Sequence, residues 1–252
     1  MKVGLFIPCY IDQFYPKVGR ATLALLQKLG CQVTYPMQQT CCGQPMANSG
    51  CEREGEATYH HFINTFQSFD YVVAPSGSCT YHVRKHYDTI EQTPAVQHLR
   101  KNTLDIAEFL LDVLQIKSLS AEFPHKVGLH QSCHGLRGLR LGQGSERMGT
   151  PYSKVGQLLQ MVKGLELVEL DRKDECCGFG GTFAVTESAV SVKMGKDRIA
   201  DHSQQGAEVI TAGDMSCLMH LEGIIRREQR PLRVMHLVEI LNGPIHPNTD
   251  NP

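Results

Sequence analysis

Two pairs of adjacent cysteines are the residues of this chain best suited to chemistry. The sequence Cys-Cys-Gly occurs at residues 41–43 and returns at residues 176–178. A disulfide between neighbouring residues strains the peptide between them, so two adjacent thiols are better placed to bind a third atom or group that they share. A glycine after each pair allows the tight backbone that two consecutive ligands require. We therefore interpret each pair as part of a metal centre.

Single cysteines flank each pair at similar distances. Cys9 precedes the first pair by 31 intervening residues, and Cys79 follows it after 36. Cys133 precedes the second pair by 42 intervening residues, and Cys217 follows it after 39. Each copy thus offers four thiolates, which is the number that an iron-sulfur cluster or a closed zinc site needs. The eight candidate ligands are Cys9, Cys41, Cys42, Cys79, Cys133, Cys176, Cys177 and Cys217.

This doubled pattern resembles the CCG cysteine-rich domain family. Its members include the B subunit of heterodisulfide reductases, the iron-sulfur subunits of glycolate oxidase and anaerobic glycerol-3-phosphate dehydrogenase, and the lactate utilization proteins. The resemblance covers essentially the whole chain as a tandem pair without a ferredoxin-like domain, which is the layout of the lactate utilization branch. It implies two [4Fe-4S] clusters as cofactors. Spacing alone leaves zinc open, although structural zinc sites usually separate their paired cysteines by about two to four residues.

The chain departs from the family pattern at two positions. The pattern ends in Cys-x-x-Cys, and here Ser76 and Asp214 take the first of those places. Relatives with all five cysteines carry a non-cubane [4Fe-4S] cluster, whereas four cysteines suffice for an ordinary cube, so the cluster type stays open. We expect Ser76 to act as a turn hydroxyl and Asp214 as a turn or N-cap carboxylate rather than as iron ligands.

A basic segment surrounds Cys133 and contains His130, His134 and Arg137. Cationic groups beside a cluster raise its reduction potential, and a carboxylate substrate needs a positive anchor. His134 and Arg137 are therefore the candidate catalytic residues. The alternative is a solvated basic loop that touches neither cluster nor substrate.

The remaining cysteines and a histidine pair have simpler interpretations. Cys31 and Cys51 have no counterpart in the other half of the sequence. We expect Cys31 to pack in the core, while Cys51, at the start of a predicted helix, is a candidate reactive thiol without a positive partner. His60 and His61 lie on a predicted helix and are expected at the surface or behind the ligands.

Alternating strands and helices must position these residues. Apolar runs predict strands at 2–8, 31–36, 71–74, 126–130, 165–170 and 208–211. Helical stripes occupy 16–29, 59–66, 104–116 and 155–162, and another helix starts near residue 218. The cysteines follow strands, and the carboxyl ends of parallel strands meet at one edge of a sheet. The four thiols of each half can therefore converge there.

The predicted fold is α/β, with two pseudo-symmetric domains that each contain a parallel sheet flanked by helices. A length of 252 residues allows one or two domains, and the duplication favours two. We place the domains at residues 1–120 and 121–252, with a linker at 117–124. Apolar and acidic positions at 105–110 recur at 236–241 and support the duplication.

Two further segments lack a repeat. Residues 135–151 contain five glycines and three arginines, and loops of this length are usually functional or disordered. Residues 243–252 hold three prolines and are expected to form a frayed tail.

Composition narrows the classes of function. The 25 Lys and Arg residues nearly balance 26 Asp and Glu residues, which argues against nucleic acid as the main partner. The apolar runs fall far short of the roughly 20 residues of a membrane span. The chain opens on a strand-like run rather than a signal peptide, so we expect a cytoplasmic protein, where clustered cysteines bind metal or do redox chemistry.

The resemblance also implies a function. It is that of an iron-sulfur electron-transfer subunit in a cytoplasmic complex that oxidises a 2-hydroxy acid, with L-lactate converted to pyruvate. The implied partners are a ferredoxin-type iron-sulfur subunit and a third small subunit. The sequence contains no GxGxxG turn and no phosphate-binding Gly-Lys-Ser or Gly-Lys-Thr, so we expect another subunit to hold any flavin or nicotinamide. The alternatives are a heterodisulfide-reductase-like thiol/disulfide redox enzyme and a zinc-stabilised interaction module.

Overall fold

The computed structural model describes residues 1–243 and divides them among short helices and strands. The first half contains β1 (Lys2–Leu5), α1 (Cys9–Phe14), α2 (Pro16–Lys28), β2 (Gln32–Thr34), α3 (Gln44–Asn48), α4 (Glu56–Phe66), β3 (Tyr71–Ala74), α5 (Gly77–His86), α6 (Pro94–Asn102), β4 (Thr103–Asp105), α7 (Ile106–Glu108) and the π-helix η1 (Phe109–Val113). The second half contains β5 (Lys126–Leu129), the π-helix η2 (His134–Gly138), α8 (Lys154–Gln160), β6 (Glu166–Leu167), α9 (Phe183–Thr186), α10 (Ser188–Gln204), β7 (Val209–Ala212), α11 (Met215–Arg227), β8 (Arg233–His236) and α12 (Leu237–Asn242). Residues 244–252 of the predicted tail lie outside the residues that the structure describes.

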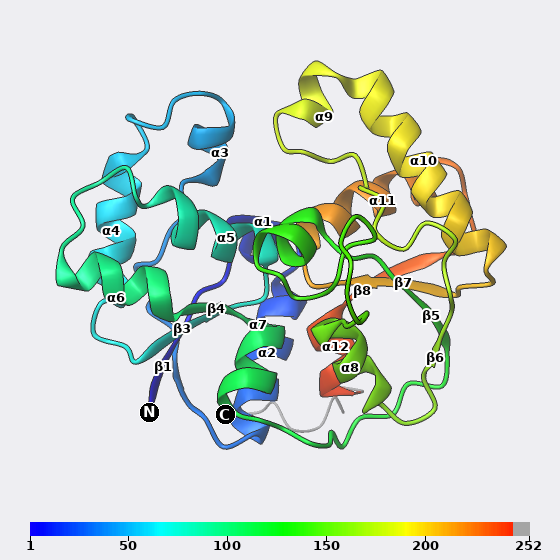
Figure 1. Ribbon diagram of the computed structural model, residues 1–252, viewed down its shortest axis with the longest axis horizontal. Helices are drawn as coiled ribbons and strands as arrows, with labels where there is room; N and C mark the ends of the chain where they lie inside the picture. The colour runs from blue at the N-terminus through cyan, green and yellow to red at the C-terminus, as the bar shows by residue number, and fades with distance from the viewer. Residues whose placement is uncertain (244–252) are drawn as a thin grey trace.

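Two parallel sheets share one topology. The first has the strand order β2-β1-β3-β4 and the second the order β6-β5-β7-β8. Every pairing within them is parallel. Figure 1 shows the sheets on either side of the central helices α2, α8 and α12. The predicted α/β class, with a parallel sheet and flanking helices in each half, is confirmed.

The central strands of the two sheets have the same sequence. β1 and β5 both read Lys-Val-Gly-Leu, and a cysteine follows each of them by four residues. Their glycines occupy equivalent places, since Gly4 pairs with Val72 of β3 and Gly128 with Ile210 of β7. The next residue after each strand differs, since it is Phe6 in the first half and His130 in the second.

Two edge strands were missed by the sequence analysis. β4 occupies the start of the helix predicted at 104–116, and β8 was not predicted at all. Both strands are short and run straight into a helix, so the helical spacing masked them. Asp105 and His236 end these strands, and the side chain of each accepts a backbone N–H two residues later. This shared helix start explains the repeat between 105–110 and 236–241.

The apolar core continues from one half into the other. α2 of the first half packs against α12 of the second, as Figure 1 shows near the centre of the molecule. One cluster of buried apolar side chains draws on both helices and on both sheets. A smaller cluster around α4 lies within the first half. Buried apolar surface thus holds the two sheets in a fixed relation, while the boundary at residue 120 stays a prediction.

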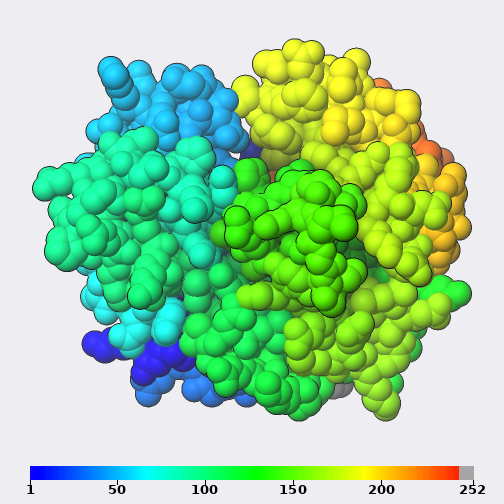
Figure 2. Space-filling view, in the orientation of Figure 1, coloured from blue at the N-terminus to red at the C-terminus, as the bar shows by residue number. Residues whose placement is uncertain are grey.

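The glycine-rich segment 135–151 lies across the junction between the halves. Its first turn, η2, packs against α5 of the other half. A Cβ on Gly77 would lie 3.1 Å from the Cα of Gly135, so the two backbones meet without side chains between them. Figure 2 shows this green segment across the front of the molecule. Between residues 1 and 243, no helix has both the length and the apolar character to cross a membrane.

Gly128 offers a test of the packing over the second sheet. A Cβ at this position would lie 2.1 Å from Nδ1 of His202, whose side chain is buried. We expect Gly128→Ala to lower the free energy of unfolding by about 1–3 kcal/mol, because neither the central strand nor the buried ring can move aside freely. Urea denaturation followed by circular dichroism measures this change.

Gly223→Ala is the matched control. A Cβ at Gly223 meets nothing within 4 Å, and the residue lies on an exposed face of α11. Alanine in an exposed helix is favoured over glycine by up to about 1 kcal/mol, so this variant should be at least as stable as the unchanged protein. Equal urea midpoints of unfolding for Gly128→Ala and Gly223→Ala would contradict the close packing of His202 over Gly128.

Candidate metal centre

The first quartet of thiols gathers at the carboxyl edge of the first sheet. Cys9 begins α1, Cys41 and Cys42 lie in the loop after β2, and Cys79 lies in the first turn of α5. The sulfur atoms of Cys9 and Cys41 are 3.8 Å apart. The thiol of Cys42 interacts with those of Cys41 and Cys79. These four side chains therefore form one continuous chain of sulfur contacts, and all are free thiols.

The second quartet repeats this arrangement at the second sheet. Cys133 directly precedes η2, Cys176 and Cys177 lie in the loop after β6, and Cys217 lies in α11 after β7. The thiol of Cys176 interacts with those of Cys133 and Cys177. Cys177 in turn interacts with Cys217. The order of contacts along this quartet is the same as in the first half.

Both quartets line one cavity of about 390 Å³ between the halves. The sequence analysis placed each quartet at the rim of its own sheet, and the fold turns these two rims toward each other. Residues of α3 and α9 line part of the cavity, and Figure 1 shows these two helices on opposite sides near its upper edge. The Thr182 hydroxyl donates a hydrogen bond of 3.3 Å to the Asn48 backbone carbonyl and links the two halves there.

Each cysteine pair requires the glycine that follows it. Gly43 has a φ of 92° and Gly178 a φ of 88°, a region that favours glycine. A Cβ would also lie 2.4 Å from the Tyr59 ring in the first half and 2.6 Å from the Ser191 carbonyl in the second. In both loops the glycine N–H donates to the first cysteine of the pair at 3.4 Å. The Cys-Cys-Gly motif is therefore a constrained turn that aims both thiols at the cavity.

The electrostatics of each quartet favour one thiolate at a time. The pKa of Cys41 is lowered to about 3, because the thiols of Cys42 and Cys9 and the N–H of Gly43 donate to it. The pKa values of Cys9 and Cys42 are raised in turn, since these thiols donate to Cys41 and are partly (Cys9) or fully (Cys42) buried. The pKa of Cys176 is likewise lowered, to about 2, by the neighbouring thiols. Further ionisation would bring like charges into contact, so a complete set of thiolates calls for a cation among them.

Ser76 and Asp214 face each other between the two quartets. They form an isolated antiparallel bridge, and the carboxylate of Asp214 accepts the N–H of Ser78 at 2.7 Å. The Ser76 hydroxyl also accepts the N–H of Cys79, and Asp214 accepts that of Ser216, so each residue caps its own helix. The expected helix-cap role of Asp214 is present, and Ser76 shares it. Together the two residues tie the helix that carries Cys79 to the opposite half.

The two candidate catalytic residues point in different directions. His134 lines the cavity, and its ring lies 5.2 Å from that of Tyr81. Arg137 instead forms ion pairs with Glu146 at 3.1 Å and Asp174 at 3.3 Å. It thereby fastens the glycine-rich segment to the loop that leads to the second cysteine pair. A direct role for Arg137 in substrate binding stays a prediction.

The other singled-out residues lie away from the cavity. Cys31 packs against the apolar core, as expected. Cys51 does not begin a helix, because α4 starts only at Glu56, so the helix-dipole argument for a reactive thiol there is wrong. His60 is exposed, and a ring nitrogen of His61 lies 2.7 Å from a backbone carbonyl. Both positions agree with the expectation that these histidines are not metal ligands.

His130 has a place that sequence spacing did not reveal. One of its ring nitrogens and the sulfur atoms of Cys177 and Cys217 all lie within 4.8 Å of one another. The side chain is buried, and neither ring nitrogen has a hydrogen-bond partner within the described part of the chain. The sequence analysis grouped His130 with the basic residues around Cys133. The repeated Lys-Val-Gly-Leu strand is the signal that sets it opposite Phe6 and marks it as unusual.

Comparisons with known proteins agree with this site. The family described as CCG, a cysteine-rich domain, matches residues 3–84 and 127–222. The chain is 40% identical over 246 residues to lactate utilization protein A of Halalkalibacterium halodurans, covering 96% of this chain and 97% of that protein. It is 39% identical over 247 residues to lactate utilization protein A of Bacillus subtilis, covering 96% and 100%.

A glutamate racemase from Bacillus anthracis is among the similar solved structures, with 10% identity, a TM-score of 0.36 and coverage of 95% of this chain and 78% of that one. That likeness is too weak to carry an argument about this chain. The two matched regions each contain one complete quartet of cysteines. On its matched regions and its curated relatives, the chain belongs to the CCG cysteine-rich domain family.

Proposed function

We propose that this chain is an iron-sulfur electron-transfer subunit that serves the oxidation of L-lactate to pyruvate. The observation that carries the proposal is the gathering of eight thiols as two quartets around one cavity. The choice of lactate as the substrate is supported by relatives of about 40% identity that are named lactate utilization protein A. The proposal includes a cytoplasmic location, a ferredoxin-type iron-sulfur subunit and a third small subunit, as the family resemblance implies.

Each quartet fits an iron-sulfur cluster by the chemistry of its donors. Thiolates are the ligands that such clusters take, and four of them hold one [4Fe-4S] unit. A cluster in either quartet would supply one-electron transfer. We assign the first cluster to Cys9, Cys41, Cys42 and Cys79, and the second to Cys133, Cys176, Cys177 and Cys217.

The surrounding residues of this chain exclude water and orient the ligands. Cys42 and Cys177 are 1% and 2% exposed, so the middle of each quartet is shielded from solvent. The hydrogen bond between Ser78 and Asp214 holds the two quartets in register. His134 lies at the wall of the cavity, and we assign to it the binding of a carboxylate substrate or of a docked redox group.

Two specific observations favour other functions. The shared cavity favours a thiol/disulfide redox enzyme, because a disulfide inside it would face both quartets. The position of His130 beside Cys177 and Cys217 favours a zinc-stabilised interaction module, because nitrogen with sulfur is a donor set that zinc takes. The tests below separate these functions from electron transfer.

Protein purified without oxygen should contain about eight iron atoms per chain and as much sulfide, because two [4Fe-4S] clusters hold four of each. It should be brown, and dithionite should bleach its visible absorption. Iron, zinc and sulfide assays on the same sample measure this. Colourless protein with stoichiometric zinc would contradict the proposed function and support the interaction module.

Cys41→Ser and Cys176→Ser should each remove about half of the iron, because each removes a ligand from one quartet only. Cys31→Ser is the matched control, since Cys31 packs in the core and lies outside both quartets. It should retain all of the iron. Loss of all iron from either ligand variant would show that the quartets do not bind metal independently.

Deletion of the gene should abolish growth on L-lactate but not on pyruvate in a host without another lactate dehydrogenase, because pyruvate is the product of the step. The unchanged gene and the Cys31→Ser variant should restore growth, and Cys41→Ser should not. Normal growth of the deletion strain on L-lactate would refute the substrate assignment. Reduction of a mixed disulfide by the purified protein would then favour the thiol/disulfide enzyme.

A further inference from the structure

The two quartets are backed by different side chains at equivalent positions. The residue that follows the Lys-Val-Gly-Leu strand is Phe6 in the first half and His130 in the second. Both are fully buried, with 0% and 1% of their surface exposed. An apolar ring behind one quartet is therefore replaced by an imidazole behind the other.

An aromatic triad surrounds this position in the first half. The ring of Phe6 lies 5.0 Å from that of Phe62 and 5.8 Å from that of Phe66, both on α4. Phe66 and Phe69 together cover the central strand, since a Cβ on Gly4 would meet the Phe69 ring at 2.8 Å and the Phe66 ring at 3.1 Å. Phenylalanine rings have no N–H or O–H group, so this triad cannot donate a hydrogen bond to a sulfur atom.

A polar triad takes the same place in the second half. His202 of α10 covers Gly128 of the central strand as Phe66 covers Gly4. Arg198 precedes His202 by one helical turn, as Phe62 precedes Phe66, and its Nε donates to His202 Nε2 at 3.2 Å. His130, Arg198 and His202 thus replace the three phenylalanines.

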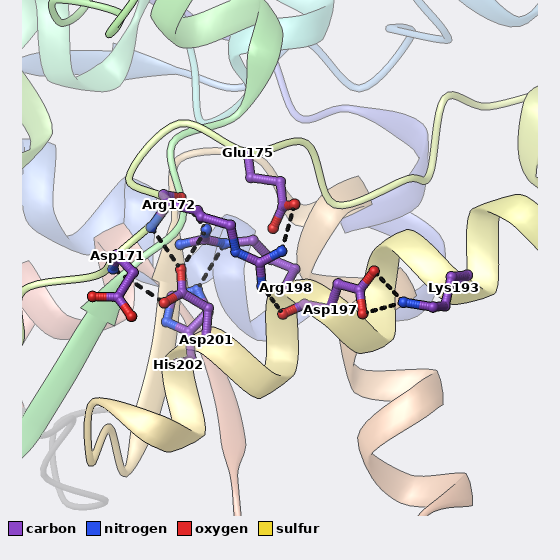
Figure 3. A network of polar contacts seen from close by, with 8 residues as sticks. All are labelled: Asp171, Arg172, Glu175, Lys193, Asp197, Arg198, Asp201 and His202. Carbon is purple, nitrogen blue, oxygen red and sulfur yellow. Dashed lines mark hydrogen bonds and ion pairs between the residues drawn. The ribbon is translucent and has the colours of Figure 1, made fainter.

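The polar triad is fixed to the loop that carries two ligands. Figure 3 shows Asp201 between Arg198 and the start of this loop. Its carboxylate accepts the N–H groups of Asp171 at 3.1 Å and Arg172 at 3.2 Å, and Arg198 donates to it at 3.0 Å. The guanidinium of Arg198 also donates to the Arg172 carbonyl. This loop runs directly into Cys176.

The charge of Arg198 is largely offset, so the difference between the halves lies in hydrogen bonding. Asp201 forms an ion pair with Arg198, and Glu175 adds a second negative charge nearby. An imidazole has at least one N–H to donate in either of its protonation states. Neither ring nitrogen of His130 has a hydrogen-bond partner among residues 1–243, and the sulfur atoms of Cys177 and Cys217 lie within 4.8 Å of one of them. These sulfur atoms are therefore acceptors that a small movement of the ring would bring into hydrogen-bonding distance.

A second pair of histidines occupies the same sequence position in both halves. His82 follows Cys79 by three residues, and His220 follows Cys217 by three. Their contacts differ, because His82 is buried with its Nε2 unpartnered among the described residues, whereas a ring nitrogen of the half-buried His220 lies 3.2 Å from the Ser191 carbonyl. Each quartet therefore has a histidine at this place, while at the position of Phe6 and His130 only the second half has one.

We propose that His130 donates its N–H to a ligand sulfur of the second quartet, and that a cluster there has a higher reduction potential than one in the first. Hydrogen bonds to the sulfurs and a more polar environment both favour the reduced, more negative state of an iron-sulfur cluster. His130 acts here as a positioning and tuning residue and not as a catalytic one. The inference rests on the proposed function, since it needs a cluster in each quartet.

Potentiometric titration followed by electron paramagnetic resonance tests this inference. The anaerobically purified protein should show two reduction waves, and Cys41→Ser, which keeps the second quartet, should retain the higher one. His130→Phe should shift the higher wave to a lower potential, leave the lower wave unmoved and keep the iron content of the unchanged protein. Phe6→Leu is the matched apolar control and should move neither wave.

A graded pair of variants separates hydrogen bonding from packing. His130→Gln keeps an N–H donor and should hold the higher wave close to its original potential, whereas His130→Leu should lower it. Equal potentials in these two variants would overturn the inference, as would an unmoved wave in fully loaded His130→Phe protein. A lack of iron in the unchanged protein would instead refute the proposed function.

A measurement on the unchanged sequence covers the case in which these variants do not fold. With histidine labelled by ¹⁵N, pulsed electron paramagnetic resonance should show a stronger histidine-nitrogen coupling at the more easily reduced centre than at the other. Equal couplings, or two coincident reduction waves, would overturn the inference.

Discussion

The close approach of four thiols at the edge of each sheet is the constraint that the rest of the structure serves. Sulfur atoms as near as the 3.8 Å between Cys9 and Cys41 cannot all carry a charge unless a cation lies among them. A constrained Cys-Cys-Gly turn, which needs glycine at its third position, achieves this approach, and the glycine N–H groups stabilise the thiolate that forms. Parallel strands that end at one edge supply the remaining ligands. Local turn geometry and sheet topology thus converge on the same few sulfur atoms.

The contact between the halves gives the site its second property, which is that both quartets open into the same space. Packing of α2 against α12 fixes the sheets relative to each other below the cavity. Ser76 and Asp214 fix them again at the level of the ligands. The glycine-rich segment then crosses the junction, where Gly77 and Gly135 allow two backbones to touch. A molecule built from two similar units therefore has one central chamber rather than two separate pockets.

Much of the local structure was predictable from the sequence, because cysteine spacing and apolar periodicity are local signals. The strands that precede Cys9, Cys79 and Cys133 fall where the pattern indicated. β4 and β8 escaped prediction because each runs without a turn into the helix that follows it, so no Gly, Pro or polar loop marks where the strand ends. The shared cavity and the contact of His130 with Cys177 and Cys217 depend on residues brought together by strand order and by packing between the halves. The spacing of residues along the sequence does not reveal which residues become neighbours in this way.

The covalent joining of two similar halves has a consequence for symmetry. A homodimer of one such unit would place identical residues behind both of its centres, and any substitution would change the two together. In a single chain, the exchange of Phe6 for His130 places an imidazole beside one quartet of thiols and leaves a phenyl ring at the equivalent place of the other. Tandem duplication thus lets evolution tune two neighbouring centres separately while the same architecture supports both, a freedom that no symmetric assembly of one gene product has.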